Sequence, residues 1–202
     1  MPFTLEQFVK IRPYAWHLTA ASNLPLIERD RRLLCAETLA ASTPTAVNEL
    51  RSAVIPVRND GATVMLRDQK PLRPSAVIFD GGWTLDDLRR AVNRHVFFWP
   101  GKADGPMQHG RNHFACYANA GDVALRMPMA TLLALNAEPK FCPFNSGAPA
   151  ARARSRRGPD TFTTADRFGR SAAGVVELVF EGTAHLPDFD VFTADRWPPA
   201  RA

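Results

Sequence analysis

The sequence predicts an α+β protein: one domain over residues 1–202, with a split, mainly antiparallel sheet and helices concentrated in the N-terminal half. This length suits a single hydrophobic core of ordinary size. Helical and strand-like segments do not alternate regularly, which argues against a parallel, doubly wound sheet. The chain has no Gly-x-Gly-x-x-Gly, Walker or Gly-x-Ser-x-Gly motif, so Rossmann oxidoreductases, P-loop NTPases and α/β-hydrolases lose support.

Helix-start signals occur at several points along the chain. Residues 4–7 read Thr-Leu-Glu-Gln, a capping box, and the apolar stripe that follows ends before Pro13. Ser22 can cap a second helix, and a short helical piece is expected around residues 36–41. A further helix is expected from the capping residue Thr84 to about Asn93.

Strands are expected where apolar runs meet turn signals. Residues 55–57 and 63–66 flank Asp60-Gly61, and this dipeptide supplies the positive φ that a hairpin turn needs. Four other runs are typical of strands: residues 14–19, 96–99, 123–127 and 174–180.

The composition sets broad limits on function. The formal net charge is +5 and the pI is near 9.6, which favours an anionic partner such as a nucleic acid or a nucleotide. No run approaches the roughly 18 apolar residues of a membrane span, and the N-terminus lacks a signal-peptide pattern, so a cytoplasmic location without membrane attachment is expected. Cys35, Cys116 and Cys142 lie far apart, which favours reduced thiols over a disulfide framework.

His17 is the most informative candidate for chemistry. Strand alternation puts Tyr14, Trp16 and Leu18 on one face, and His17 on the other with small residues that leave room for a ligand. The alternative is a buried structural histidine bonded to a backbone carbonyl.

Glu177 is the second candidate, because it interrupts an otherwise apolar strand. A carboxylate is costly to bury there without a partner or a function. Alternation puts Val175, Glu177 and Val179 on one face and Leu178 with Phe180 on the other. The alternative is a glutamate that faces solvent from a half-exposed sheet.

Two other groups of residues are candidates for a metal site and for a phosphate-binding loop. His109, His113 and Cys116 carry zinc-type ligands, but Gly110 disfavours a continuous helix there and no further pair completes a tetrahedral set, so no metal is expected. Residues 151–158 contain four arginines and almost nothing apolar, which predicts a mobile basic loop that either contacts phosphates or only adds solubility.

The order of these motifs resembles the DarT-type ADP-ribosyltransferases and their relatives of unknown function. The resemblance rests on Tyr-x-x-His-x-Thr at residues 14–19, Asn-Leu-x-x-Ile at 23–27, the aromatic strand at 96–99, and the isolated Glu177. It spans residue 14 to about 190. Residues 67–72 and 144–147 also look like motifs of an uncharacterised bacterial family with this layout.

The resemblance implies a split ADP-ribosyltransferase sheet with NAD between the first strand and the aromatic strand. It implies a catalytic role for Glu177, with Lys102 near the place where the family has a catalytic arginine. The NAD-binding residues that it implies, together with an aromatic platform for nicotinamide, are His17, Thr19, Asn23, Phe98 and Trp99. Lys102 or Arg94 could pair with the pyrophosphate, or could be a solvated surface charge.

The leading hypothesis is therefore an NAD-dependent ADP-ribosyltransferase with a DNA or RNA acceptor. The chemistry suits these residue types, since a carboxylate that holds ribose hydroxyls stabilises the positive charge that develops on the sugar. The alternatives are a catalytically inactive nucleotide- or nucleic-acid-binding domain on the same scaffold, and a plain interaction domain. The transferase hypothesis requires His17 and Glu177 to face one cleft.

Overall fold

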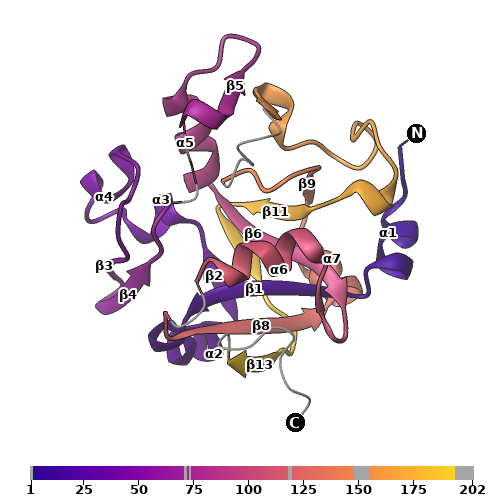
Figure 1. Ribbon diagram of the computed structural model, residues 1–202. Coiled ribbons are helices and arrows are strands. Elements are labelled where there is room, and N and C mark those ends of the chain that lie inside the picture. Colours follow the sequence, from indigo (N-terminus) through magenta and orange to yellow (C-terminus); the bar gives the residue numbers. More distant parts are fainter. Residues whose placement is uncertain (1, 71, 73, 118–119, 148–154, 194–202) are drawn as a thin grey trace.

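A central antiparallel sheet of seven strands organises the chain (Figure 1). The computed structural model describes residues 2–70, 72, 74–117, 120–147 and 155–193. The strand order is β13-β8-β1-β6-β11-β9, and the short strand β7 pairs with β6 outside this path. The strands are β13 (Asp190–Thr193), β8 (Asp122–Pro128), β1 (Tyr14–Ala20), β6 (His95–Lys102), β11 (Glu177–Glu181), β9 (Lys140–Cys142) and β7 (Gly105–Pro106).

Three two-stranded sheets lie outside the central one. The expected hairpin is confirmed as β3 (Ile55–Asn59) with β4 (Ala62–Leu66), and Asp60 and Gly61 both have the positive φ that its turn needs. The other two pairs are β2 (Arg32–Leu34) with β12 (Thr183–His185), antiparallel, and β5 (Val77–Phe79) with β10 (Ser155–Arg157), parallel.

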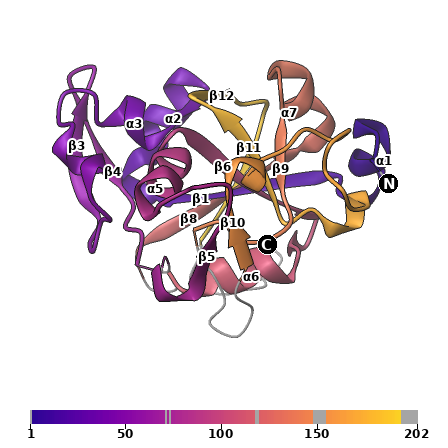
Figure 2. The same ribbon diagram turned by 90° about the horizontal axis from the view of Figure 1, so that it is seen from above.

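Helices cover both faces of the central sheet. They are α1 (Leu5–Ile11), α2 (Leu24–Asp30), α3 (Ala36–Leu39), α4 (Thr45–Asn48), α5 (Leu85–Asn93), α6 (Gln108–Ala115) and α7 (Met129–Leu135), with 3-10 turns at Ala21–Asn23, Pro74–Ala76, Pro159–Thr161 and Ala172–Gly174. Both predicted capping boxes form, at Thr4 for α1 and at Thr84 for α5. Seen from above, α6 lies on one side of the sheet and α2 and α7 on the other (Figure 2).

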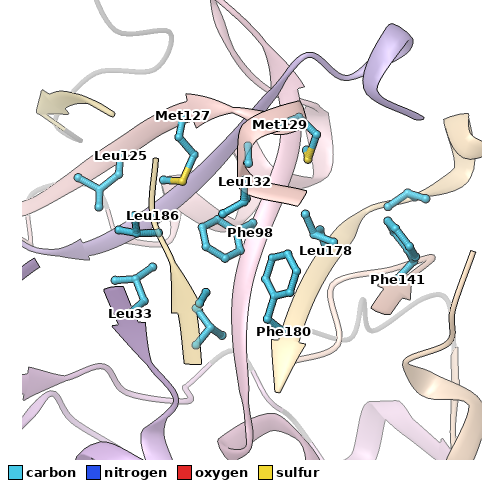
Figure 3. Packing of buried hydrophobic residues seen from close by; sticks show 14 of the residues in the cluster. Leu33, Phe98, Leu125, Met127, Met129, Leu132, Phe141, Leu178, Phe180 and Leu186 are labelled. Carbon is cyan, nitrogen blue, oxygen red and sulfur yellow. The ribbon is translucent and has the colours of Figure 1, made fainter. Parts of the chain in front are cut away.

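The hydrophobic core divides into two layers along the strands. Phe98 of β6 and Leu178 with Phe180 of β11 belong to the larger layer, which packs under α1, α2 and α7 (Figure 3). Trp16, Leu18 and Trp99 belong to the layer under α6. The predicted alternation in β1 and β11 is therefore confirmed: Trp16 and Leu18 share a face, and so do Leu178 and Phe180.

The α+β class with mainly antiparallel pairing is confirmed. Helices α1 to α5 lie in the N-terminal half, but α6 and α7 follow the aromatic strand and each covers a face of the sheet, so the helices are not confined to that half. The expectation of a mobile loop over 151–158 is only partly testable, since 151–154 lie outside the described residues. Ser155–Arg157 form β10 instead, because Arg157 is fully buried and its strand pairs with β5.

Candidate functional site

The central sheet splits between β1 and β6. Their ladder pairs Tyr14 with Gly101, Ala15 with Pro100 and Trp16 with Trp99, and then stops. Beyond that point β1 continues to pair with β8 as far as Ala20, whereas β6 pairs with β11. Strands that part in this way leave backbone groups without ladder partners, and these groups must be satisfied by other means.

The imidazole of His17 bridges β1 and β6 at the split. Its Nδ1 lies 2.8 Å from the carbonyl oxygen of Phe97, on the opposite strand. Burial lowers the pKa of His17 to about 4, so the ring is neutral at pH 7. Because a carbonyl can only accept, Nδ1 carries the proton and donates it, which leaves Nε2 as an acceptor. His17 thus makes the backbone contact expected of a structural histidine. It also has the position expected of a ligand-binding histidine, since it lines a pocket.

Glu177 lies on the other side of the split, at the start of β11. Leu178 pairs with Phe98, so Glu177, one residue earlier, shares the opposite face with Trp99. The side chain is buried, and its Oε2 accepts a hydrogen bond of 3.0 Å from the backbone N–H of Ser146. Burial raises the pKa of Glu177 to about 7, although Ser146 and the charge of Arg157 oppose the rise.

His17 and Glu177 line the same pocket of about 260 Å³. Consecutive residues of β1, from His17 to Ala20, contribute to its wall, as do Val96 and Phe97 of β6. Because neighbouring strand residues face opposite ways, a wall made by both faces means that the pocket lies at the strand edges, within the split. His17 lies on the Phe98 side of the sheet, with ring centroids 5.6 Å apart, and Glu177 lies on the Trp99 side, so the two residues reach one pocket from opposite faces of the sheet.

The segment from Phe144 to Gly147, termed the 144–147 segment below, borders the pocket beside Glu177. Arg157 binds this segment through two hydrogen bonds: Nε donates to the Ser146 carbonyl at 3.2 Å, and Nη2 donates to the Asn145 carbonyl at 3.0 Å. The guanidinium also lies 3.7 Å from the ring centroid of Phe144. Asn145 accepts a hydrogen bond of 3.0 Å from the indole N–H of Trp99, which ties the segment to β6.

Helix α6 covers the aromatic side of the pocket. His113 stacks on Trp99 with ring centroids 4.4 Å apart, and both residues line the pocket. The helix continues through Gly110, contrary to the expectation of a break. A Cβ at that position would lie 2.7 Å from Cβ of Pro106 and 2.9 Å from Cβ of Trp99, so glycine is what allows the helix to approach the sheet.

A polar wall that the sequence did not reveal closes another side. Arg67 donates to Asp122 at 2.8 Å, and its guanidinium carbon lies 4.2 Å from the ring centroid of Tyr117. The Tyr117 hydroxyl lies 3.3 Å from Asp68. Residues 67 and 68 follow the hairpin directly but Tyr117 and Asp122 come much later, so only the fold brings them together. Their single signal in sequence is the 67–72 motif.

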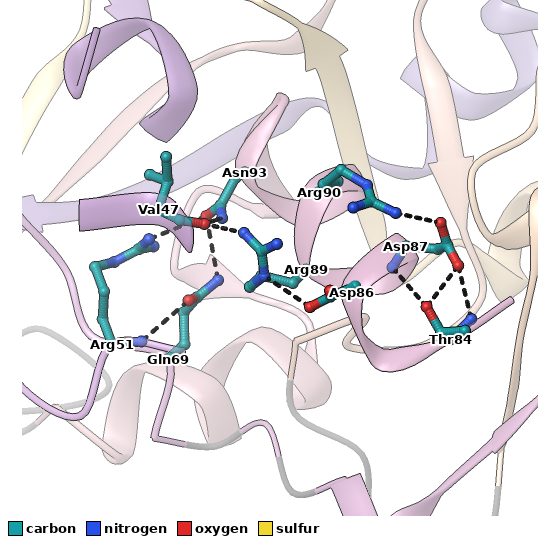
Figure 4. Close-up of polar contacts among 9 residues, drawn as sticks. All are labelled: Val47, Arg51, Gln69, Thr84, Asp86, Asp87, Arg89, Arg90 and Asn93. Atoms are coloured by element: carbon teal, nitrogen blue, oxygen red, sulfur yellow. Dashed lines mark hydrogen bonds and ion pairs between the residues drawn. The ribbon is translucent and has the colours of Figure 1, made fainter. Parts of the chain in front are cut away.

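The backbone of this wall is fixed by a polar network next to α5. Arg51 donates to the Arg67 carbonyl at 2.7 Å. Arg51 also donates to Asn93 at 3.0 Å, and Gln69 donates to Asn93 at 3.2 Å (Figure 4). Arg89 also contacts the Val47 carbonyl. These contacts secure the segment that brings Arg67 and Asp68 to the pocket.

The remaining wall combines an apolar surface with polar residues at its margin, which are Arg29, Asp30, Arg32, Asn59 and Asp60. The apolar surface is formed by side chains of α2, α3 and the β3–β4 hairpin: Leu26, Ile27, Ala36, Leu39, Val64 and Leu66. The pocket therefore combines an apolar surface with several polar and charged groups, a combination typical of sites for small organic ligands.

Of the predicted site residues, His17, Thr19, Asn23, Trp99 and Glu177 line the pocket. Phe98 and Lys102 do not. Phe98 points the other way, into the core under α7, and its neighbour Phe97 takes the place in the wall. Strand alternation predicts that Phe97 and Phe98 face opposite ways, but it does not tell which of them faces the pocket, because both faces of β6 are buried. Lys102 is exposed at the far end of β6, where its carbonyl accepts from the Trp16 indole.

Two other predicted groups have local partners. Asn23 fastens the hairpin, since its amide donates to the Met65 carbonyl at 3.0 Å and accepts from the Met65 N–H at 2.8 Å. It also donates to Thr19 at 3.2 Å. Arg94 forms an exposed ion pair of 3.2 Å with Glu37. Asn23 and Thr19 therefore shape the pocket wall with polar groups that already bond each other.

The described residues contain no cluster of three or more His, Cys, Asp or Glu side chains that could hold a metal ion. His109 and Cys116 are exposed on α6, whereas His113 turns inward onto Trp99. The three thiols are free, with Cys35 and Cys142 buried.

Comparison with known families gives one match. Residues 13–188 match the model of the family described as "Family of unknown function (DUF7002)". The chain belongs to this family. The matched range includes β1 with His17, the aromatic strand β6, the 144–147 segment and β11 with Glu177, so the DUF7002 region contains every wall of the pocket. A search of curated proteins found no match.

None of the helices in the described ranges has the length and apolar character needed to cross a bilayer.

Proposed function

We propose that this DUF7002 protein is an NAD-dependent ADP-ribosyltransferase. The observation that carries the proposal is that His17 and Glu177, from opposite ends of the chain, line one pocket in the split between β1 and β6. The resemblance to DarT-type enzymes calls for these two residues on these two strands. The pocket also combines a buried carboxyl, a neutral imidazole and aromatic rings, which are the groups that a ribose bearing a flat heterocycle requires.

The residues fit a bound dinucleotide in the following way. Nε2 of His17 accepts a hydrogen bond from a ribose hydroxyl, because its Nδ1 proton is engaged by Phe97. Phe97 and the Trp99–His113 stack offer aromatic surface for a planar ring at the same end. The apolar side chains beneath the hairpin suit the second base, and Arg67, Arg29 and Arg32, which also line the pocket, are cations suited to the pyrophosphate.

NAD supplies a ribose C1′ whose bond to nicotinamide breaks as the bond to an acceptor forms. Glu177 is the catalytic residue: as a carboxylate it binds the ribose hydroxyls and stabilises the positive charge that develops on the sugar. Its burial strengthens this interaction, since charges act more strongly where water is excluded. The same burial raises its pKa to about 7, so the ionised form becomes dominant only above neutral pH.

A nucleic acid is the proposed acceptor. The net charge of +5 favours a polyanionic partner. This arm of the proposal predicts that added DNA or RNA captures the ADP-ribosyl group, with a yield that falls as salt rises.

One observation favours a second candidate. Lys102, which stands near the place of the family's catalytic arginine, lies outside the pocket. A protein that binds NAD through His17 but lacks this cation would be a non-catalytic nucleotide-binding domain.

Titration calorimetry distinguishes the two candidates from a protein that does not bind NAD. The wild type should bind NAD, His17→Leu should bind it at least about tenfold more weakly, and Arg94→Gln, at an exposed ion pair outside the pocket, should bind it normally. Nicotinamide release by the same samples then separates transferase from binding domain. Equal NAD affinity in all three proteins, or none in any, would overturn the proposal.

A further inference from the structure

We infer that Arg157 is a positioning residue for Glu177, acting through the 144–147 segment. The catalytic part of this inference rests on the proposed function, but its structural part does not. In sequence, Arg157 is one of four arginines in a polar stretch and resembles a solvated surface charge. In the fold it is fully buried, on a strand that pairs with β5.

The contacts form a short chain from one residue to the other. The Arg157 guanidinium donates to the carbonyls of Asn145 and Ser146, at 3.0 and 3.2 Å. The N–H of Ser146 in turn donates to Oε2 of Glu177 at 3.0 Å. Arg157 thus binds the carbonyl side of the residue whose N–H binds the carboxylate. The orientation of that N–H depends on where the guanidinium holds the segment.

The shape of arginine explains why this residue type is used. Its planar fork can bond two neighbouring carbonyls at once while one face packs on a ring, here Phe144 at 3.7 Å. A lysine supplies a point charge without this fork. Burying a cation is costly, so a fully buried guanidinium that bonds backbone carbonyls of one segment indicates that the placement of this segment matters.

The neighbouring residue provides a matched control. Arg156 precedes Arg157 on β10, has a side chain 68% exposed, and pairs with Asp80 at 3.3 Å. Substitutions at both positions change the net charge equally. Only those at Arg157 alter the contact chain that reaches Glu177.

The test compares Arg157→Lys and Arg157→Met with Arg156→Lys and Arg156→Met in the full chain. The first readout needs no activity: the carboxyl carbon of Glu177, assigned by its absence in Glu177→Gln, is titrated by NMR. Because the Arg157 charge and the Ser146 bonds both lower the pKa of Glu177, Arg157→Met should raise it further. Arg157→Lys should give a smaller rise, and the Arg156 variants none.

The second readout is nicotinamide release. A positioning role predicts that Arg157→Lys lowers kcat by on the order of tenfold with little change in KM, and moves the acid limb of the pH profile to higher pH. In a Glu177→Gln background the same substitution should have no further effect, because the residue through which it acts is gone. Phe144→Leu, which removes the ring on which the guanidinium packs but keeps the buried charge itself, should show the same changes more weakly.

The outcomes separate this inference from the proposed function. If the wild type releases no nicotinamide, the proposed function fails, and the Glu177 titration alone decides whether Arg157 positions that residue. If folded Arg157 and Phe144 variants leave the titration of Glu177 and kcat at the values of the Arg156 controls, the inference is overturned.

Discussion

Nδ1 of His17 lies 2.8 Å from the carbonyl oxygen of Phe97, across the point where β1 and β6 part. This contact gives one side chain two functions. It satisfies a backbone acceptor that the broken ladder leaves without a strand partner, and it fixes the ring so that Nε2 is the nitrogen free to accept. The split in the sheet thereby holds a pocket whose wall includes a polar ring nitrogen.

The tautomer of His17 can be tested directly. We predict that ¹⁵N NMR at pH 7 shows a neutral ring with the proton on Nδ1, and that the ring protonates only near pH 4, the pKa to which burial lowers it. A proton on Nε2 at pH 7 would contradict the assigned role as acceptor.

Replacing Glu177 by glutamine should stabilise the folded protein at high pH. Burial raises the folded-state pKa of Glu177 from 4.5 to about 7, so ionisation destabilises the native state progressively between these two pH values. The stability advantage of Glu177→Gln should therefore be absent below pH 4.5 and reach about 3 kcal/mol above pH 7. Urea unfolding at pH 4 and pH 8 measures both limits.

The difference in unfolding free energy between Glu177→Gln and the wild type cancels the contributions of other titrating groups. His17 has a lowered folded-state pKa, so it contributes stability that is present above 6.5 and lost as pH falls towards 4, in both proteins alike. An advantage of Glu177→Gln that stayed constant with pH would show that Glu177 does not titrate as its burial implies.

Asn23→Ala should lower the unfolding free energy without removing a catalytic group. The substitution leaves the N–H and the carbonyl of Met65 without partners where β4 contacts the 3-10 turn at Ala21–Asn23, which costs about 1–3 kcal/mol of unfolding free energy. Asn59→Ala is the control, because that exposed amide makes one bond of 3.3 Å to the Thr38 carbonyl. Equal unfolding free energies for the two variants would contradict the fastening role of Asn23.

Gly110→Ala tests the approach of α6 to the sheet. Alanine is normally the better helix former by up to about 1 kcal/mol, so propensity alone predicts stabilisation. The close approach to Pro106 and Trp99 predicts the opposite sign, a loss of about 1–3 kcal/mol with a change in the fluorescence of Trp99. Thermal unfolding with fluorescence detection distinguishes the two, and a stabilised variant would show that α6 has room to move.

Local signals in the sequence were sufficient for much of the fold. The capping boxes at Thr4 and Thr84 and the Asp60-Gly61 turn depend on neighbouring residues, and all three form. The alternation that separates Trp16 from His17 depends on the chain's own geometry. His17 and Glu177 could be named as candidates from the sequence because a titratable side chain in an apolar strand is unusual, and both residues line the pocket.

The features that were missed depend on contacts distant in sequence. Phe97 and Phe98 could not be told apart because both faces of β6 are buried, so hydrophobicity does not set the phase. Arg157 looked like a surface charge, since the carbonyls of Asn145 and Ser146 that justify its burial are invisible to composition. The wall formed by Arg67 and Tyr117 joins residues 50 positions apart, so it exists only in the folded chain.

The central claim is that Glu177 breaks the ribose–nicotinamide bond of NAD held in the split. The most direct measurement is nicotinamide release from NAD, with and without DNA or RNA, by the wild type and by Glu177→Gln, whose fold the urea experiment verifies. The account predicts release by the wild type that rises through pH 7 and falls by at least about a hundredfold in Glu177→Gln. NAD binding without release, or release that persists in Glu177→Gln, would contradict it.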